Sequence, residues 1–131
     1  MYRRKSRQLK LGNMFIGGDA PISVQSMTNT KTENVEATVN QIKELTALGC
    51  DIIRCAVPDL RAALALSAIK AQISIPLIAD IHFDYKLALE AIAAGVDGLR
   101  LNPGNIGGKD EVLQVITKAS ERNIPIRIGV N

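Results

Sequence analysis

The regular alternation between short apolar segments and segments with helical periodicity constrains the fold of this chain more than any other feature. Apolar runs of strand length occur at 22–27, 52–57, 76–81, 98–102 and 125–130. Helical periodicity fills the intervals between them, at about 30–49, 59–72, 84–95 and 108–122. Successive strands start 22 to 30 residues apart. This spacing is typical of repeated β-α units and predicts a parallel sheet in an α/β fold.

The first helix shows the clearest end signals. Its apolar residues between Val35 and Leu45 recur on one face. Thr30 and Glu33 have the spacing of a capping box, which predicts that the helix begins there. Gly49 follows the periodic segment and is typical of a helix end.

A β-hairpin is predicted before the first parallel strand. In the segment QLKLGNMFIGG, residues 8–18, two short runs flank Gly12-Asn13. We expect this hairpin to close the bottom of a barrel. The sequence therefore divides into a basic tail with a hairpin at 1–18 and a barrel segment at 19–131.

Two β-α junctions resemble each other. The segment LGCDIIRCAVP at 48–58 and the segment AGVDGLRLNPG at 94–104 share Gly, Asp and Arg in the same positions, and each reaches a Pro at the end of its strand. Their separation equals two β-α units, which favours a barrel over a doubly wound sheet with one switch point. Alternate strands of a barrel contribute to the same interior layer, so Arg54 and Arg100 are expected to face one space.

Composition excludes several classes of protein. With 131 residues, 47% of them hydrophobic, the chain can build a core, and its 3% of aromatic residues makes that core aliphatic. No apolar run is long enough for a membrane helix, and no signal peptide is recognisable, so we expect a soluble, cytoplasmic protein.

The positive charge belongs to the N-terminal tail. Five basic residues lie in the first ten, and removing them changes the formal net charge from +3 to −2. Because no aromatic residues interleave with them, a solvated tail is favoured over a nucleic-acid-binding arm. Cys50 and Cys55 have no metal-binding spacing, and Cys55 reads as a small buried hydrophobe.

Polar residues interrupt the predicted strands with period two. Asp80 and His82 end the third strand, Arg100 and Asn102 the fourth, and Arg54 lies in the second. The fifth strand carries Arg127, with Asn131 four residues later. A single arginine, histidine or aspartate of this kind is often structural. Together they cluster at the carboxyl ends of parallel strands, where α/β folds place their sites.

Charge balance indicates what this cluster binds. Three arginines face one carboxylate, that of Asp80, which leaves a surplus of about two positive charges. Desolvating an uncompensated charge costs several kcal/mol, so an anion with two or more charges is the expected ligand. Arginine binds phosphates with bidentate contacts. The loop NPGNIGG, residues 102–108, is expected to add backbone N–H groups, although it is not a Walker A loop.

Four segments carry a family resemblance: VQSMTNT at 24–30, PLIADIHFDYKLAL at 76–89, RLNPGNIG at 100–107 and IRIGVN at 126–131. With them the chain resembles the 4-hydroxy-3-methylbut-2-enyl diphosphate synthases, iron-sulfur oxidoreductases of the methylerythritol phosphate route to isoprenoids. The resemblance implies a (β/α)8 TIM barrel, of which this chain holds five strands and four helices. It also implies a C-terminal domain with a [4Fe-4S] cluster.

The resemblance further implies an activity and partners. The family reductively converts 2-C-methyl-D-erythritol 2,4-cyclodiphosphate to 4-hydroxy-3-methylbut-2-enyl diphosphate, with flavodoxin or ferredoxin as electron donor. A homodimer is expected when the enzyme is complete, with no nucleic acid or membrane partner. In this family, the residues that form the substrate side of the active site match those in the polar cluster described above: Arg54, Asp80, His82, Arg100, Asn102, Arg127 and Asn131.

The match with this family is partial. The cluster ligands and the last three barrel strands are expected beyond Asn131, and Cys50 and Cys55 do not match the cluster motif. The chain is therefore interpreted as an N-terminal fragment that is inactive alone. Two alternatives stay open: a pteroate-synthase-like transferase barrel, and a non-catalytic phosphoanion-binding half barrel that dimerises.

Overall fold

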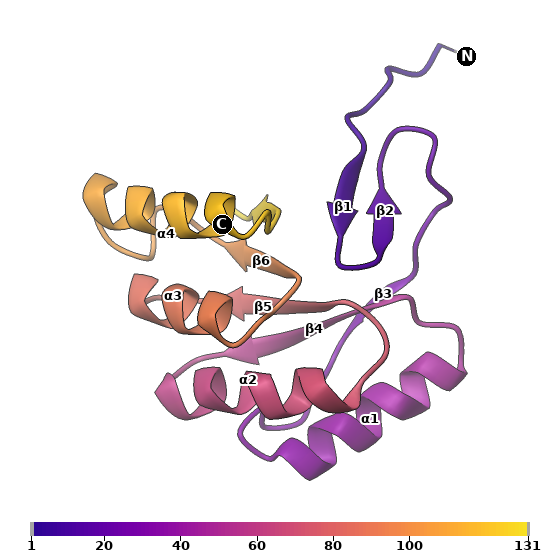
Figure 1. Ribbon diagram of the computed structural model, residues 1–131, viewed down its shortest axis with the longest axis horizontal. Helices are drawn as coiled ribbons and strands as arrows, with labels where there is room; N and C mark the ends of the chain where they lie inside the picture. Colours follow the sequence, from indigo (N-terminus) through magenta and orange to yellow (C-terminus); the bar gives the residue numbers. More distant parts are fainter. Residues whose placement is uncertain (1, 131) are drawn as a thin grey trace.

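The computed structural model describes residues 2–130, and its elements alternate between strands and helices after an initial hairpin (Figure 1). The strands are β1 (Leu9–Leu11), β2 (Met14–Ile16), β3 (Gln25–Met27), β4 (Ile52–Val57), β5 (Leu77–Ile81), β6 (Gly98–Leu101) and β7 (Ile126–Ile128). The helices are α1 (Val35–Ala47), α2 (Leu60–Gln72), α3 (Tyr85–Ala93) and α4 (Lys109–Glu121).

Strands β3 to β7 form one parallel sheet in chain order, β3-β4-β5-β6-β7. A doubly wound sheet would reverse direction at a switch point, whereas a barrel wall adds each strand beside the last. The predicted α/β fold with five parallel strands, four helices and a preceding hairpin is therefore confirmed.

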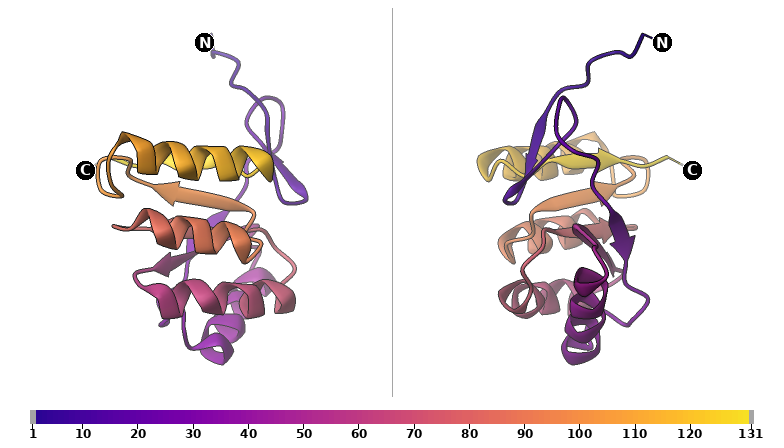
Figure 2. Two further views of the ribbon diagram at one scale, coloured as in Figure 1. Left: turned by 60° about the vertical axis from the view of Figure 1, so that its left-hand side comes forward. Right: turned by 90° about the vertical axis from the view of Figure 1, so that its right-hand side faces the viewer.

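The four helices cover one face of the sheet, as Figure 2 shows from two sides. The main core lies between these layers and includes fully buried Ile53 and Leu77 from the sheet and Leu66 from α2. Because side chains alternate along a strand, the intervening residues of β4, Ile52 and Arg54 among them, point to the opposite face. That face would line the interior of a barrel.

The N-terminal hairpin packs against this second face, at the amino ends of the strands (Figure 1). Its turn is Gly12-Asn13, and Gly12 has a φ of +58°, which suits the first turn position of a type II′ hairpin. Leu11 is 2% exposed and packs against Ile52 and Ile78. The predicted hairpin is confirmed, and a cleft of about 550 Å³ lies between it and the sheet.

The predicted start of the first helix is wrong. Asn34 is the N-cap of α1, and its side-chain oxygen accepts a hydrogen bond from the Ala37 N–H at 3.2 Å. Thr30 is not a cap because its hydroxyl pairs with the Thr38 hydroxyl at 2.7 Å. The carboxylates of Asp59 and Asp84 cap α2 and α3 within a residue of the expected starts.

The two outer strands are shorter than expected. The apolar run 22–27 is a strand only from Gln25, and the run 125–130 is a strand only over Ile126–Ile128. Each outer strand has one neighbour, so fewer of its residues form ladder hydrogen bonds. Within residues 2–130, none of the helices has the length and apolar character needed to cross a membrane.

Candidate functional site

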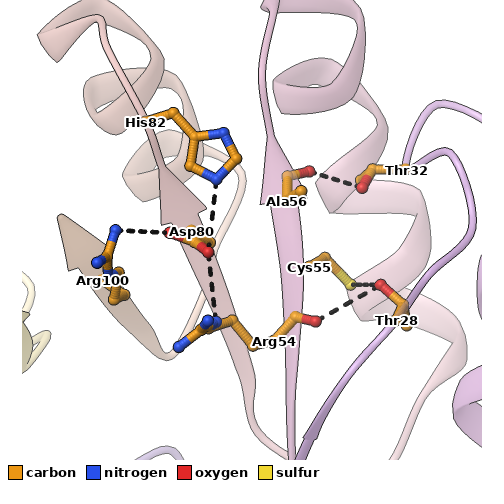
Figure 3. Close-up of polar contacts among 8 residues, drawn as sticks. All are labelled: Thr28, Thr32, Arg54, Cys55, Ala56, Asp80, His82 and Arg100. Atoms are coloured by element: carbon orange, nitrogen blue, oxygen red, sulfur yellow. Dashed lines mark hydrogen bonds and ion pairs between the residues drawn. The ribbon is translucent and has the colours of Figure 1, made fainter. Parts of the chain in front are cut away.

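Asp80 is the centre of a charged cluster on the face of the sheet opposite the helices (Figure 3). It lies on β5 and is 3% exposed. Its Oδ2 atom is 3.3 Å from Arg54 Nε and 3.5 Å from His82 Nε2, and its Oδ1 atom is 3.5 Å from Arg100 Nη1. Three basic side chains from three strands or strand ends therefore share one buried carboxylate.

The register of the sheet produces this cluster. Arg100 on β6 lies directly opposite Asp80, while Arg54 on β4 lies opposite Ile78, two residues earlier on β5. Residues two apart share a face, so both guanidinium groups and the carboxylate project to the same side. The structure thus places Arg54 and Arg100 in one space, as the two similar β-α junctions predict.

The cluster carries more positive than negative charge. Two guanidinium groups face the single carboxylate, and the Arg54 and Arg100 side chains remain 25% and 22% exposed. Arg54 Nε is buried, yet its approach to Asp80 does not have hydrogen-bond geometry. A buried donor without a hydrogen-bond acceptor is costly, so the Arg54 guanidinium is only partly compensated by Asp80.

Arg127 occupies the same face but a different environment. It lies directly opposite Arg100 in the sheet register and is exposed. Its side chain lines the cleft under the hairpin, whereas the ion pairs of Asp80 involve Arg54, His82 and Arg100. The structure therefore brings four of the seven expected residues into contact and leaves Arg127 at the margin of the cluster.

Asn102 has a local structural role at the start of the β6–α4 loop. Its Oδ1 atom accepts a hydrogen bond from the Gly104 N–H at 2.9 Å, and its backbone carbonyl accepts one from the Asn105 N–H at 2.9 Å. These two N–H groups are thus occupied within the turn. The expectation that the loop offers them to an anion is wrong for Gly104 and Asn105. Asn131 lies outside the described residues.

Sequence reasoning missed the hydrogen bonds that join the loop between β3 and α1 to β4, the strand that carries Arg54 (Figure 3). The Thr28 hydroxyl donates to Cys55 Sγ at 3.4 Å, and the Thr32 hydroxyl donates to the Ala56 carbonyl at 2.6 Å. The run of threonine and asparagine after β3 was the available signal, because such residues favour loops with side-chain hydrogen bonds over helix interiors. Burial raises the pKa of the Cys55 thiol, and the Thr28 hydrogen bond partly opposes this shift.

The cysteines do not fit an iron-sulfur cluster. Cys50 and Cys55 are both buried, and Cys50 Sγ donates to the Ile52 carbonyl at 3.1 Å. Across residues 2–130, no three side chains of His, Cys, Asp or Glu are grouped so that they could hold a metal ion. A cluster needs four ligands of this kind, so the part of the chain described by the structure does not supply them.

Fold and site together define a β/α-barrel protein with an arginine-rich cluster on the face of its central strands opposite the helices. Residues 6–131 match the GcpE TIM-barrel domain. The chain belongs to this family.

Similar full-length proteins carry one name. The chain is 62% identical over 129 residues to a protein of Dehalococcoides mccartyi strain CBDB1, and 59% identical over 131 residues to one of Clostridium perfringens strain 13. Both are named 4-hydroxy-3-methylbut-2-en-1-yl diphosphate synthase (flavodoxin). The matches cover 98% and 100% of this chain but only 37% and 38% of those proteins. The chain therefore spans little more than a third of their length.

Similar solved structures support the barrel fold. A 7,8-dihydropteroate synthase from Vibrio fischeri ES114 superposes with a TM-score of 0.68 at 15% identity, covering 92% of this chain and 48% of that one. A mandelate oxidase superposes with a TM-score of 0.56 at 14% identity, covering 82% and 48%. At these identities the likeness shows the fold alone.

Proposed function

We propose that this chain is the substrate-binding barrel segment of a 4-hydroxy-3-methylbut-2-enyl diphosphate synthase. Its ligand is 2-C-methyl-D-erythritol 2,4-cyclodiphosphate, which the enzyme opens reductively. The observation that carries the proposal is the convergence of Arg54 and Arg100 on the buried Asp80. Sequence identity of about 60% to proteins with that name supports the same substrate.

The charge of the cluster suits a diphosphate. Guanidinium groups form paired, charge-assisted hydrogen bonds with phosphate oxygens, at about 1.5–3 kcal/mol for each contact. Asp80 is too buried to face the ligand, so its role is to hold Arg54 and Arg100 in place. Arg127 adds a third positive charge from the neighbouring strand.

The remaining site residues complete the binding surface. His82 is a hydrogen-bond donor from the end of β5, 3.5 Å from Asp80 and partly exposed. The side-chain oxygen of Asn102 accepts the hydrogen bond of its turn, and its side-chain NH₂ group is proposed to donate to the ligand. Asn131 is proposed to join them from the segment after β7.

The reaction needs two electrons and two protons, and one substrate oxygen leaves as water. A flavodoxin is the proposed donor, in line with the name of the relatives. The residues of this chain bind and orient the cyclodiphosphate. Because its cysteines do not fit a cluster, no redox step is assigned to them.

A ligand panel tests the proposal. Calorimetry with the cyclodiphosphate, inorganic pyrophosphate and a pterin separates a synthase barrel from a pteroate-synthase-like transferase. Arg100→Ala is expected to weaken cyclodiphosphate binding by about 1.5–3 kcal/mol, the range for one charge-assisted contact. Arg61→Ala removes an exposed charge from α2 and should leave binding unchanged. Equal losses in the two variants would contradict a specific site.

Turnover is tested in a complete enzyme. This chain can replace the matching segment of the Dehalococcoides mccartyi relative, with which it shares 62% identity. The hybrid should convert the cyclodiphosphate with a reduced flavodoxin, and Arg100→Ala should lower kcat/KM. An inactive hybrid that still holds its cluster would count against the proposal. Light scattering of the 131-residue chain with pyrophosphate tests the alternative of a dimeric, non-catalytic half barrel.

A further inference from the structure

We propose that Gly129 is a positioning residue for Arg100: it leaves the space in which the Arg100 guanidinium lies, and thereby sets the affinity of the anion site. This inference rests on the proposed function. It concerns a residue with no polar side chain, outside the charged cluster itself.

The geometry places Gly129 directly against Arg100. Gly129 follows β7, and its N–H donates to the Leu101 carbonyl at 2.8 Å, which fixes it beside β6. A Cβ atom at position 129 would overlap Arg100 Nη2 and would lie 2.5 Å from both Cζ and Nε. Real Cβ atoms essentially never come this close to another atom. Any larger residue would therefore displace the guanidinium.

The backbone gives no other reason for glycine at this position. Gly17 and Gly95 have φ angles of +76° and +93°, where a side chain causes strain, but the φ of Gly129 lies outside this region. An alanine would fit the backbone at 129, and the three atoms nearest to its Cβ would all belong to Arg100. A substitution at position 129 should therefore act mainly by moving the guanidinium group at the end of the flexible Arg100 side chain.

The space at Gly129 also decides where the charge of Arg100 lies. Arg100 is directly opposite Arg127, a like-charge arrangement that is unfavourable across strands. Gly129 lies two residues beyond Arg127 on the same face. The Arg100 guanidinium occupies the space left beside Gly129 and therefore extends toward the carboxyl end of the sheet. In this position its Nη1 atom stays 3.5 Å from Asp80 Oδ1. It is thus held between β5 and β7 before a ligand binds.

A double-mutant cycle with inorganic pyrophosphate tests this role. The proteins are the unaltered chain, Gly129→Ala, Arg100→Ala and the double variant, with Arg61→Ala as a control. Arg61 is exposed on α2, in the layer on the opposite face of the sheet. Gly129→Ala should raise the Kd of pyrophosphate about tenfold, which corresponds to about 1.4 kcal/mol. In the Arg100→Ala background it should have no further effect.

A second readout follows the Arg100 side chain itself. The ¹⁵N-¹H signal of Arg100 Nε should be sharp in the unaltered chain and in Arg61→Ala. It should move or broaden in Gly129→Ala. The unfolding temperature of Gly129→Ala should stay close to that of the unaltered chain. The inference would be overturned if the losses of binding free energy were additive in the double variant. It would also be overturned if the Kd were unchanged in Gly129→Ala, or if that variant failed to fold. If the unaltered chain binds neither pyrophosphate nor cyclodiphosphate, the proposed function fails, whereas the Nε signal still tests the position of Arg100.

Discussion

Arg100 and Asp80 are direct neighbours across β6 and β5, and the same pair forms an ion contact between Nη1 and Oδ1 at 3.5 Å. The carboxylate is almost completely buried, while the guanidinium remains partly open to solvent. The pair therefore has one side fixed inside the protein and one side available to a ligand. This division allows the stability of the chain and its affinity for anions to be measured separately.

Replacing Asp80 with Asn should destabilise the free chain. The substitution keeps the shape but removes the only charge that compensates Arg54 and Arg100 within the cluster. We expect the free energy of unfolding to fall by about 1–3 kcal/mol, measured by urea denaturation at low salt. Pyrophosphate should restore more stability to this variant than to the unaltered chain. Asp19→Asn, at an exposed position, is the control, and equal stability of the two variants would contradict the prediction.

Arg127→Ala should change stability and binding in opposite directions. Arg127 faces Arg100 across the strands, and like charges in this position repel by about 0.2–1 kcal/mol. Its removal should therefore slightly stabilise the free chain at low salt, and this gain should vanish at high salt. The Kd of pyrophosphate should rise about tenfold, since one charge-assisted contact is worth about 1.5 kcal/mol or more. If Arg127→Ala lowered both the stability of the free chain and its affinity for pyrophosphate, Arg127 would have a structural role instead.

Stability should decline at alkaline pH because of Cys55. Burial raises the pKa of this thiol in the native chain, so the unfolded chain loses its proton first as pH increases. The free energy of unfolding should be unaffected by this group below about pH 8.5 and should fall above it, until the native thiol also ionises. Denaturation curves across this range should show a smaller decline in Cys55→Ala. Cys50→Ala retains the Cys55 thiol and should keep the full decline.

The hairpin should be coupled to the sheet through Gly98. A Cβ atom there would lie 2.7 Å from Leu11 Cδ1, so Gly98→Ala overpacks the contact and should cost about 1–3 kcal/mol of unfolding free energy. Leu11→Ala leaves a cavity and should cost about 2–5 kcal/mol. The double variant should lose less than the sum of the two, because the smaller residue at 11 makes room for the methyl group at 98. Additive losses would show that the two residues do not share the contact.

The sequence predicted the part of the site that depends on strand periodicity. Arg54, Asp80 and Arg100 lie on one face because, in each of their strands, the apolar residues that alternate with them pack against the helices. Their contacts with one another required the register itself, which brings Arg100 opposite Asp80 and Arg54 two residues away. The similar segments around Arg54 and Arg100 gave the one available indication that the two strands align.

Loop chemistry could not be predicted in the same way. Thr30 and Glu33 match a capping box, but Asn34 caps the helix because the Thr30 hydroxyl is engaged with Thr38. Asn102 uses its carbonyl oxygen within its own turn, which no periodicity reveals. The role of Gly129 could not be predicted from the sequence either, because it depends on contact with the Arg100 side chain of the neighbouring strand.

The ion contacts of Asp80 have a kinetic consequence. Arg54 and Arg100 are oriented during folding, so the reorganisation that would otherwise accompany ligand capture has already taken place. Encounter with an anion then requires only diffusion and displacement of solvent, and the association rate follows the long-range field of the cluster. Substitutions that loosen Arg100 without removing its charge should therefore leave association nearly unchanged and shorten the lifetime of the bound state.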